Sequence, residues 1–191
     1  MELIIATNNK HKLLEIKPLL PNNINLITLA EVGITEDIPE TGKTLKDNAL
    51  IKAEYAFLKT GFNSFADDTG LEVEALNGAP GVYSARYAGE NQDAKKNIEL
   101  LLKNLSGIEN RKACFKTVIA LILDGKQYFF EGVVNGKILE HEKGTDGFGY
   151  DPIFLPDGYN QTFAEMSLEQ KNQISHRSRA VEGLVGFLKK R

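Results

Sequence analysis

The stretch that most constrains the fold is the twelve-residue run from Lys112 to Leu123, which is rich in β-branched, aromatic and other apolar residues. Such a run is typical of a largely buried strand. It ends at Asp124-Gly125, a dipeptide that favours a two-residue hairpin turn, and Asn135-Gly136 offers a second hairpin signal. The chain therefore predicts a long antiparallel hairpin, with its one cysteine, Cys114, as a small core residue.

Helical segments are expected on both sides of this hairpin along the chain. At the start of the chain, a short strand and a polar loop lead into a helix that Pro21 should stop, and Thr44 with Asp47 resembles a capping box at the start of another helix. Strands mixed with helices predict a mixed-sheet α/β or α+β fold in one domain, residues 1–191. The expected strands are 2–6 and 26–29, and the expected helices are 10–20, 44–59, 91–105, one after Ser167 with Gln170 in its capping box, and 175–190.

Composition narrows the class of protein. A chain of 191 residues with 42% hydrophobic residues can bury a sizeable core. Its 23 basic and 26 acidic residues form no block of like charge typical of nucleic-acid binding, so a polyanionic ligand needs local cations. With no signal peptide and no apolar run of membrane-spanning length, we expect a soluble, cytoplasmic protein without a membrane partner.

Asp67 and Asp68 are adjacent carboxylates that follow the apolar pair Phe65-Ala66 and precede an expected glycine turn at Gly70. Like charges at neighbouring positions repel, so a fold keeps such a pair in solvent unless a cation or a chemical task holds it. A metal site or a proton acceptor is one interpretation. A solvated turn is the other, because Asp, Thr and Gly are ordinary turn residues.

Two segments offer cations to an anionic ligand. Residues 7–12, Thr-Asn-Asn-Lys-His-Lys, lie where a strand is followed by a helix N-terminus, which attracts phosphate, although a polar cap with solvated lysines is the simpler explanation of this segment taken alone. Lys52 falls beside the apolar stripe of its helix, twelve residues after Glu40. Such an inward-leaning lysine needs an anion, unless its stem only carries the charge out to solvent.

Two later segments could recognise a planar base. In residues 147–151, Gly-Phe-Gly-Tyr-Asp, aromatic rings lie between glycines, which suits stacking on a base as well as a tight turn. His176 and Arg177 open a helix, where cations oppose the helix dipole, so we expect an anionic or carbonyl-rich partner. Lys171 is a further donor nearby, whereas His11 and His141 taken alone are interpreted as surface residues.

Together these segments closely resemble the inosine triphosphate pyrophosphatase family, the XTP/dITP diphosphatases. The resemblance implies Mg²⁺-dependent hydrolysis of non-standard purine triphosphates (dITP, ITP, XTP) to a monophosphate and pyrophosphate. It also implies an elongated two-lobed fold around a mixed sheet with flanking helices, a substrate cleft between the lobes, and a homodimer. The segments that carry it are 6–12, 40–42, 48–53, 65–71, 78–87, 147–152, 162–166 and 171–180.

The resemblance also implies residue roles. Asp68 resembles the proton acceptor that activates water and helps to hold the metal, and Glu40 resembles the other metal-associated carboxylate. A donor such as Arg177 could bond the 6-keto oxygen of a purine, where adenine presents another donor. The residues that match substrate contacts are Thr7, Asn8, Asn9, Lys10, His11, Lys12, Lys52 and Thr69, and those that match the base-recognition wall are Phe148, Gly149, Tyr150, Asp151, Lys171, His176 and Arg177.

Two alternatives stay open. One is another nucleotide pyrophosphatase of the Maf-like kind, which acts on modified pyrimidine nucleotides; activity on dITP and XTP but not on TTP or UTP separates the two. The other is a nucleotide-binding regulatory module without turnover. That class has little use for Asp68 beside an anionic ligand, and a count of pyrophosphate released per protein decides it.

Overall fold

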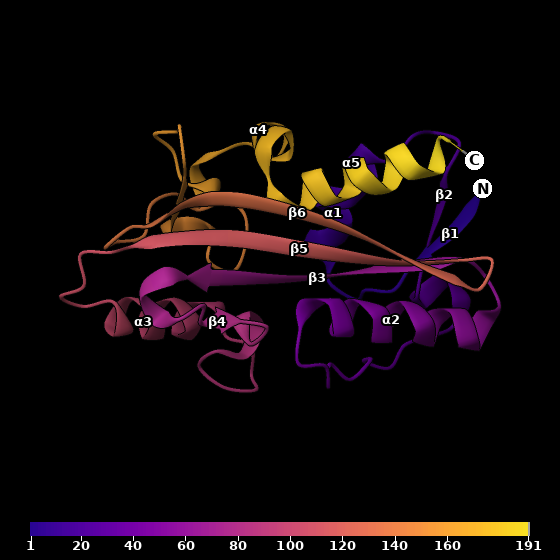
Figure 1. Ribbon diagram of the computed structural model, residues 1–191, viewed down its shortest axis with the longest axis horizontal. Coiled ribbons are helices and arrows are strands. Elements are labelled where there is room, and N and C mark those ends of the chain that lie inside the picture. Colours follow the sequence, from indigo (N-terminus) through magenta and orange to yellow (C-terminus); the bar gives the residue numbers. More distant parts are fainter. Residues whose placement is uncertain (191) are drawn as a thin grey trace. The chain divides into compact units, whose positions relative to one another are not determined.

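The computed structural model describes residues 1–190 (Figure 1), and these divide into two compact units. Unit 1 comprises Met1–Asp68, Thr117–Gly132 and the chain from Arg177 onward, and unit 2 comprises Thr69–Lys116 and Val133–His176. The strand order is β2-β1-β3-β5-β6-β7, with β4 paired to β3. The elements are β1 Glu2–Ile5, α1 Lys10–Ile16, β2 Asn25–Thr28, α2 Leu45–Thr60, β3 Ser64–Val73, β4 Pro80–Gly81, α3 Ala94–Asn104, β5 Lys112–Leu123, β6 Lys126–Ile138, β7 Phe154–Pro156, α4 Leu168–Ile174 and α5 His176–Leu188.

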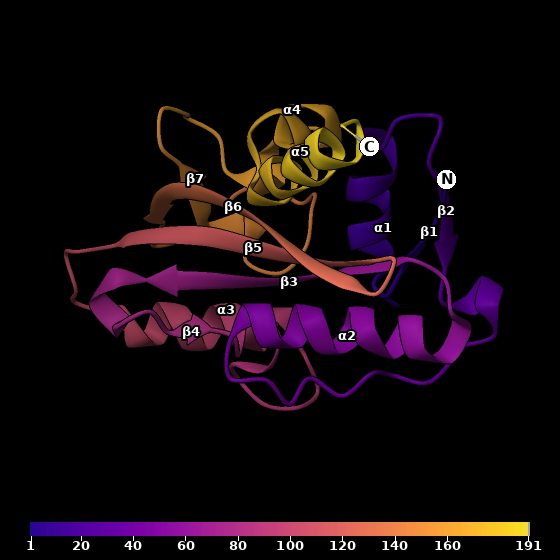
Figure 2. The ribbon, with the colours of Figure 1, turned by 45° about the vertical axis from the view of Figure 1, so that its right-hand side comes forward.

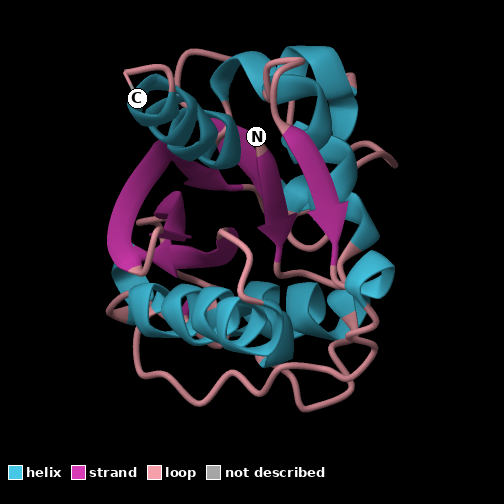
Figure 3. Ribbon diagram, turned by 90° about the vertical axis from the view of Figure 1, so that its right-hand side faces the viewer, coloured by secondary structure: helices cyan, strands magenta, loops and turns pink. Residues whose placement is uncertain are grey.

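In unit 1 helices cover both faces of the sheet. Strand β1 runs parallel to β2 and β3, and its successive side chains point to opposite faces. Leu3 and Ile5 join the core cluster that contains residues of α1 and α5, whereas Ile4 joins the cluster that contains the small residues Ala49 and Ala53 of α2. Figures 2 and 3 show α5 on one side of the N-terminal strands and α2 on the other. Three layers of this kind bury both faces of a parallel sheet.

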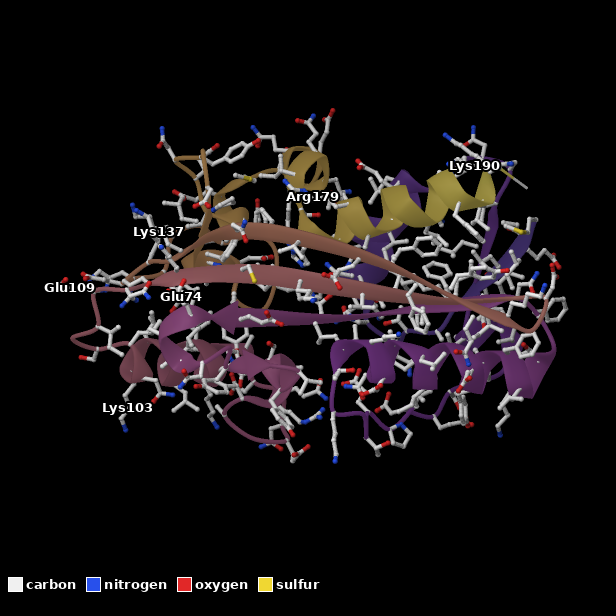
Figure 4. The ribbon with its side chains drawn as sticks, viewed as in Figure 1. Glu74, Lys103, Glu109, Lys137, Arg179 and Lys190 are labelled. Carbon is white, nitrogen blue, oxygen red and sulfur yellow. The ribbon has the colours of Figure 1, made fainter. Side chains whose placement is uncertain are left out.

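Unit 2 has its own aromatic core. Phe115 meets Phe154 edge to face, with ring centroids 4.7 Å apart, and packs against Phe163 at 6.0 Å. Leu101 from α3 and Val73 from β3 complete this cluster. Charged side chains of unit 2 such as Glu74, Lys103, Glu109 and Lys137 lie at the surface (Figure 4).

The mixed sheet with flanking helices confirms the predicted fold class. Strand β5 has the predicted bounds, and Asp124 and Gly125 both have positive φ angles, 51° and 72°, as a type I′ hairpin turn requires. The capping boxes at Thr44 and Ser167 are both present. Cys114 is only half-buried and so is not a core residue, because its neighbours Ala113 and Phe115 belong to the core in its place.

Two local predictions are wrong. Asn135-Gly136 forms no turn but lies within β6, where a Cβ on Gly136 would come within 2.3 Å of the Leu155 carbonyl oxygen on the paired strand β7. The glycine therefore permits close backbone approach. The first helix ends at Ile16, four residues early, and continues as a 3₁₀ turn that contains Pro18. Within residues 1–190, no helix combines the length and the apolar character needed to cross a membrane.

Candidate active site

The adjacent carboxylates Asp67 and Asp68 lie inside strand β3, so the glycine turn expected after them is wrong. Because side chains alternate along a strand, the two carboxylates point to opposite faces of the unit 1 sheet. Both are buried, Asp67 completely and Asp68 with 6% exposed. A solvated turn is therefore excluded, and each carboxylate needs its own partners.

On one face, four ionised side chains of unit 1 form what we term the Asp67 cluster. The Asp67 carboxylate oxygen Oδ2 lies 3.1 Å from Lys12 Nζ and 3.2 Å from Arg177 Nε. Arg177 also donates through its terminal nitrogen to Glu15, and Lys12 donates to the Asp67 carbonyl oxygen at 3.2 Å. Glu15 and Arg177 are almost fully buried. The anionic partner expected for Arg177 at a helix start is thus present.

Burial and charge act against each other in this cluster. Burial alone would raise the pKa of Asp67, but Lys12, Arg177 and Lys52 lower it well below the usual range for a carboxyl. Burial lowers the pKa of Lys12, and Asp67 offsets only part of that effect. For Arg177, the charges of Glu15 and Asp67 outweigh burial and raise the pKa. Asp67 is therefore held as a permanent anion.

On the other face, a second group of unit 1 forms what we term the Asp68 cluster. Asn48, fully buried on α2, donates from Nδ2 to Asp68 Oδ2 at 3.1 Å. Lys52, one turn later on α2, places Nζ 2.7 Å from Glu40 Oε1 and 3.6 Å from Asp68 Oδ1. Lys52 is only 8% exposed. The interpretation of Lys52 as an inward-leaning lysine with an anionic partner is confirmed.

In the Asp68 cluster the pKa of the aspartate shifts upward, in the opposite direction to the pKa of Asp67. Burial is the largest cause of a raised pKa at Asp68, and Lys52 only partly opposes it. Burial lowers the pKa of Lys52, but Asp68, Glu40 and Asp67 together raise it above its ordinary value. Neighbouring carboxylates whose pKa values are pushed apart by their surroundings are suited to different tasks.

The loop that carries Glu40 lies close against helix α2. The Gly42 amide donates to Asn48 Oδ1 at 2.8 Å, so one side chain links this loop to Asp68. A Cβ on Gly42 would come within 2.6 Å of Asp47 Cβ and 2.7 Å of Asn48 Oδ1. Glycine at this position therefore allows the loop to approach the helix.

The predicted loop between β1 and α1 is present, and it presents mainly polar atoms. Asn9 caps α1 by accepting from the amides of His11 and Lys12 at 2.9 and 3.3 Å. Asn8 donates to Asp37, and the amide of Asn9 donates to Thr7 Oγ1. Lys10, His11 and His141 are exposed, as interpreted for both histidines. Of the lysines in the segment, Lys12 alone belongs to a buried cluster.

Most of the predicted base-recognition residues gather in unit 2. Lys171 Nζ lies 2.6 Å from Asp151 Oδ2 and above the rings of Phe148 and Phe163, 5.1 and 5.3 Å from their centroids. The Phe148 amide donates to the same Asp151 oxygen at 2.8 Å. His176 stacks on Phe115, 4.6 Å between centroids. A cation, a carboxylate and several rings thus lie together.

Glycines and a buried tyrosine shape this loop. Gly147 has a φ of 75°, and a Cβ there would lie 2.2 Å from Asp151 Oδ2. Gly149 also has a positive φ, 61°. Tyr150 is buried and donates from its hydroxyl to the Ser84 carbonyl oxygen at 2.9 Å; burial raises its pKa. Thr69, half-buried in β3, is the first residue of unit 2.

Sequence reasoning assigned no role to Glu15 or Asn48, and it gave Asp67 none apart from its pairing with Asp68. Glu15 offers a weak signal because it follows two leucines and precedes an isoleucine in a helix. Asn48 has a stronger one, since it lies four residues before Lys52 and hence on the same side of α2. The partners of Asp67 are remote in the chain, with Arg177 separated from it by 110 positions.

Comparison with known proteins identifies the family of this chain. Residues 3–187 match the model of the Ham1 family. The chain is 54% identical to the dITP/XTP pyrophosphatase of Flavobacterium johnsoniae, covering 98% of both chains, and 55% identical to that of Porphyromonas gingivalis, covering 98% of this chain and 97% of that protein.

Solved structures give the same result. The Staphylococcus aureus Ham1 protein has a TM-score of 0.91 and 43% identity over 100% of this chain and 99% of its own. A Ham1 protein from Coxiella burnetii has a TM-score of 0.92 and 40% identity over 100% of both chains. The resemblance drawn from the sequence motifs is thereby confirmed: this chain belongs to the Ham1 family.

Proposed function

We propose that this protein hydrolyses dITP, ITP and XTP to the nucleoside monophosphate and pyrophosphate. The observation that carries the proposal is the Asp68 cluster, a buried carboxylate held beside a second carboxylate and a lysine. Relatives about half identical over almost the full chain bear the name dITP/XTP pyrophosphatase. Full-length similarity at this level supports the same activity here.

In this proposal Asp68 accepts a proton from the attacking water. The water oxygen bonds to the α phosphorus, and the bond from that phosphorus to the bridging oxygen breaks, so that pyrophosphate leaves. The raised pKa makes Asp68 a stronger base than an ordinary aspartate, while Asn48 fixes its orientation. Asp67 stays ionised and serves as a support.

The donor set of the Asp68 cluster fits Mg²⁺. Glu40 and Asp68 offer carboxylate oxygens to the same ammonium group, and within residues 1–190 no group of three or more His, Cys, Asp and Glu side chains forms a metal cage. Mg²⁺ suits this arrangement because it binds through one or two carboxylates, waters and substrate phosphates. When bound, it would neutralise charge on the phosphates.

The other predicted residues divide between phosphate and base. We assign the phosphates to Lys12, Lys52 and the polar loop of residues 7–11 with Thr69, because the substrate is a polyanion. We assign the base to residues 148–151, Lys171 and His176, where rings and charged groups lie together. For Arg177 we propose support of Lys12 through Asp67, with direct reading of the base as the alternative.

The remaining predictions complete the proposal. We propose that residues 1–191 act as one catalytic domain, that the protein forms a homodimer and that it works in the cytoplasm. The resemblance to the family implies the single domain and the homodimer, and sedimentation equilibrium with and without nucleotide measures the oligomeric state directly.

A pyrophosphate-release assay tests the proposed function. We expect many turnovers per protein on dITP, ITP and XTP, and little on dATP, TTP or UTP. Turnover should stop in EDTA and return with added Mg²⁺, because the carboxylate donors suit a hard cation and no cysteine–histidine cluster occurs in residues 1–190. Full turnover in chelator after dialysis would contradict the metal-dependent mechanism.

A further inference from the structure

The ammonium group of Lys52 pairs with both carboxylates, Glu40 and Asp68, that are proposed to bind the metal. Its Nζ is 2.7 Å from Glu40 Oε1 and 3.6 Å from Asp68 Oδ1, so one ammonium group contacts a carboxylate from each side. The two carboxylates come from separate segments, the loop before α2 and strand β3. Lys52 is thus the internal counterion of this pair.

We propose that Lys52 exchanges partners during binding: its ammonium leaves Glu40 and Asp68 when a divalent cation takes these carboxylates, and moves to the phosphate oxygens of the nucleotide. This inference rests on the proposed function. Its consequence is that metal and nucleotide bind cooperatively. The metal frees Lys52 to contact the phosphates, and the phosphates give the displaced ammonium an anionic partner.

The exchange follows from the geometry of the oxygens. A divalent ion that binds Glu40 Oε1 sits about 2.0–2.1 Å from an oxygen that already accepts a hydrogen bond from the Lys52 ammonium, so the two cations compete for the charge of one oxygen. Two cations on one carboxylate pair also repel each other. A metal bound to this pair therefore disfavours the present position of Lys52.

Lysine is well suited to move. Its ammonium is a compact charge on a flexible four-carbon stem, and it needs an anion wherever it settles in a buried place. The phosphates of a metal-bound nucleotide supply that anion close to the carboxylates. In contrast, the Asn48 amide bonds the other oxygen of Asp68, Oδ2, so that Asp68 can keep its orientation while Lys52 moves.

The exchange predicts a coupling that can be measured without turnover. By linkage, the nucleotide must tighten metal binding by the same factor by which the metal tightens nucleotide binding. Without nucleotide, Lys52 competes with the metal, so free protein should bind it weakly. Removal of the lysine charge should remove the competition and much of the coupling.

We would titrate Mn²⁺, which shares the oxygen preference of Mg²⁺, and follow the electron paramagnetic resonance signal of the free ion. Without nucleotide, Lys52→Met should bind Mn²⁺ about 5–150-fold more tightly than the unaltered protein, the usual range of such couplings. Lys52→Gln, which keeps a hydrogen-bonding group for Glu40 but has no charge, should change in the same direction. Lys46→Met, at an exposed lysine of the same helix, is the matched control and should leave Mn²⁺ binding unchanged.

A dITP analogue with a methylene bridge between the α and β phosphorus atoms should tighten Mn²⁺ binding to the unaltered protein, and much less to Lys52→Met. If both Lys52 variants, folded by circular dichroism, bind Mn²⁺ no more tightly than the unaltered protein, the exchange is wrong. That outcome is separate from failure of the proposed function, which would show as no release of pyrophosphate from dITP in the presence of Mg²⁺. Metal-dependent hydrolysis with unchanged Mn²⁺ affinity would reject the exchange alone.

Discussion

The two faces of strand β3 in unit 1 hold adjacent aspartates in contrasting surroundings. In the Asp67 cluster, a carboxylate oxygen is shared by a lysine and an arginine, and the arginine has a second carboxylate behind it. In the Asp68 cluster, one lysine serves two carboxylates and an amide holds the aspartate. One aspartate has a lowered pKa and the other a raised pKa.

This contrast shows how adjacent residues of one strand can serve two purposes, one stabilising the fold and the other available for catalysis. The alternation of a β-strand gives neighbouring residues different partners without any break in the backbone. The neighbouring cations make Asp67 a fixed anion. At Asp68 the cations offset only part of the effect of burial, so this carboxylate can take up a proton. Mutations on the two faces should therefore affect different measurements.

The largest expected effect is on turnover. Asp68→Asn should lower kcat by about 10²–10⁴-fold, the usual contribution of a general base, because the amide cannot accept the proton. Its denaturant midpoint should stay close to that of the unaltered protein, since the pair with Lys52 at 3.6 Å is long. A variant that keeps more than a third of the turnover would remove Asp68 from its catalytic role.

Arg177→Ala should affect stability most among the Asp67-cluster variants. It leaves Asp67 and Glu15 as buried anions without this partner, a loss of about 3–5 kcal/mol in the free energy of unfolding measured with urea. At permissive temperature, kcat/KM for dITP, XTP and dATP should fall by similar factors. Arg179→Ala, at an exposed arginine of the same helix (Figure 4), is the control and should change neither quantity much.

Loss of activity on dITP and XTP alone, with dATP unaffected, would restore Arg177 to the base-reading role predicted from the sequence. Phe148→Ala gives the comparison for generic stacking. Because every base has a π face, that variant should lower kcat/KM for the three nucleotides alike, by about 1–3 kcal/mol in apparent binding energy.

Asp67→Asn should cost about 3 kcal/mol of stability near neutral pH, since a neutral amide no longer balances Lys12 and Arg177. The pKa of Asp67 is lowered in the folded protein, so its contribution is complete above the unfolded value of about 3.9 and is lost as pH falls toward the folded value. Urea unfolding in EDTA should thus show the two proteins converging in acid. A constant gap down to pH 2 would contradict this assignment, and Glu109→Gln at the surface is the control.

The smallest effect should come from Asn48, which links the loop that carries Glu40 to Asp68. Asn48→Ala removes an acceptor from the Gly42 amide and a donor from Asp68, at a cost of about 1–3 kcal/mol in stability. Because Asp68 loses its orientation, kcat should also fall while KM changes little. An unchanged kcat would show that Asp68 is fixed without Asn48.

Local signals in the sequence predicted much of the fold. Capping residues such as Thr44 and turn residues such as Asp124-Gly125 act on the backbone within a few positions, so their effects are visible in the chain itself. Asn135-Gly136 was misleading because the same dipeptide that favours a turn also suits close strand packing, which depends on the distant residue Leu155.

The site was predictable only in part, for the same physical reason. The segment around Asp68 and the inward-leaning Lys52 show their chemistry locally. The Asp67 cluster joins residues up to 162 positions apart, and nothing near Glu15 in the sequence marks its partner Arg177. Both carboxylates are buried, and the cations that tertiary packing brings to each of them determine which one is fixed and which is basic.

The two clusters should also respond differently to changes in ionic strength. In the Asp67 cluster two positive groups balance two negative ones, so this buried assembly is neutral and largely shielded from dissolved salt. In the Asp68 cluster two carboxylates share the ammonium group of Lys52, and these carboxylates are the proposed ligands of a mobile cation. Potassium or sodium chloride should therefore weaken the uptake of a divalent ion long before it weakens the fold, and comparisons of metal affinity are meaningful only at a fixed salt concentration.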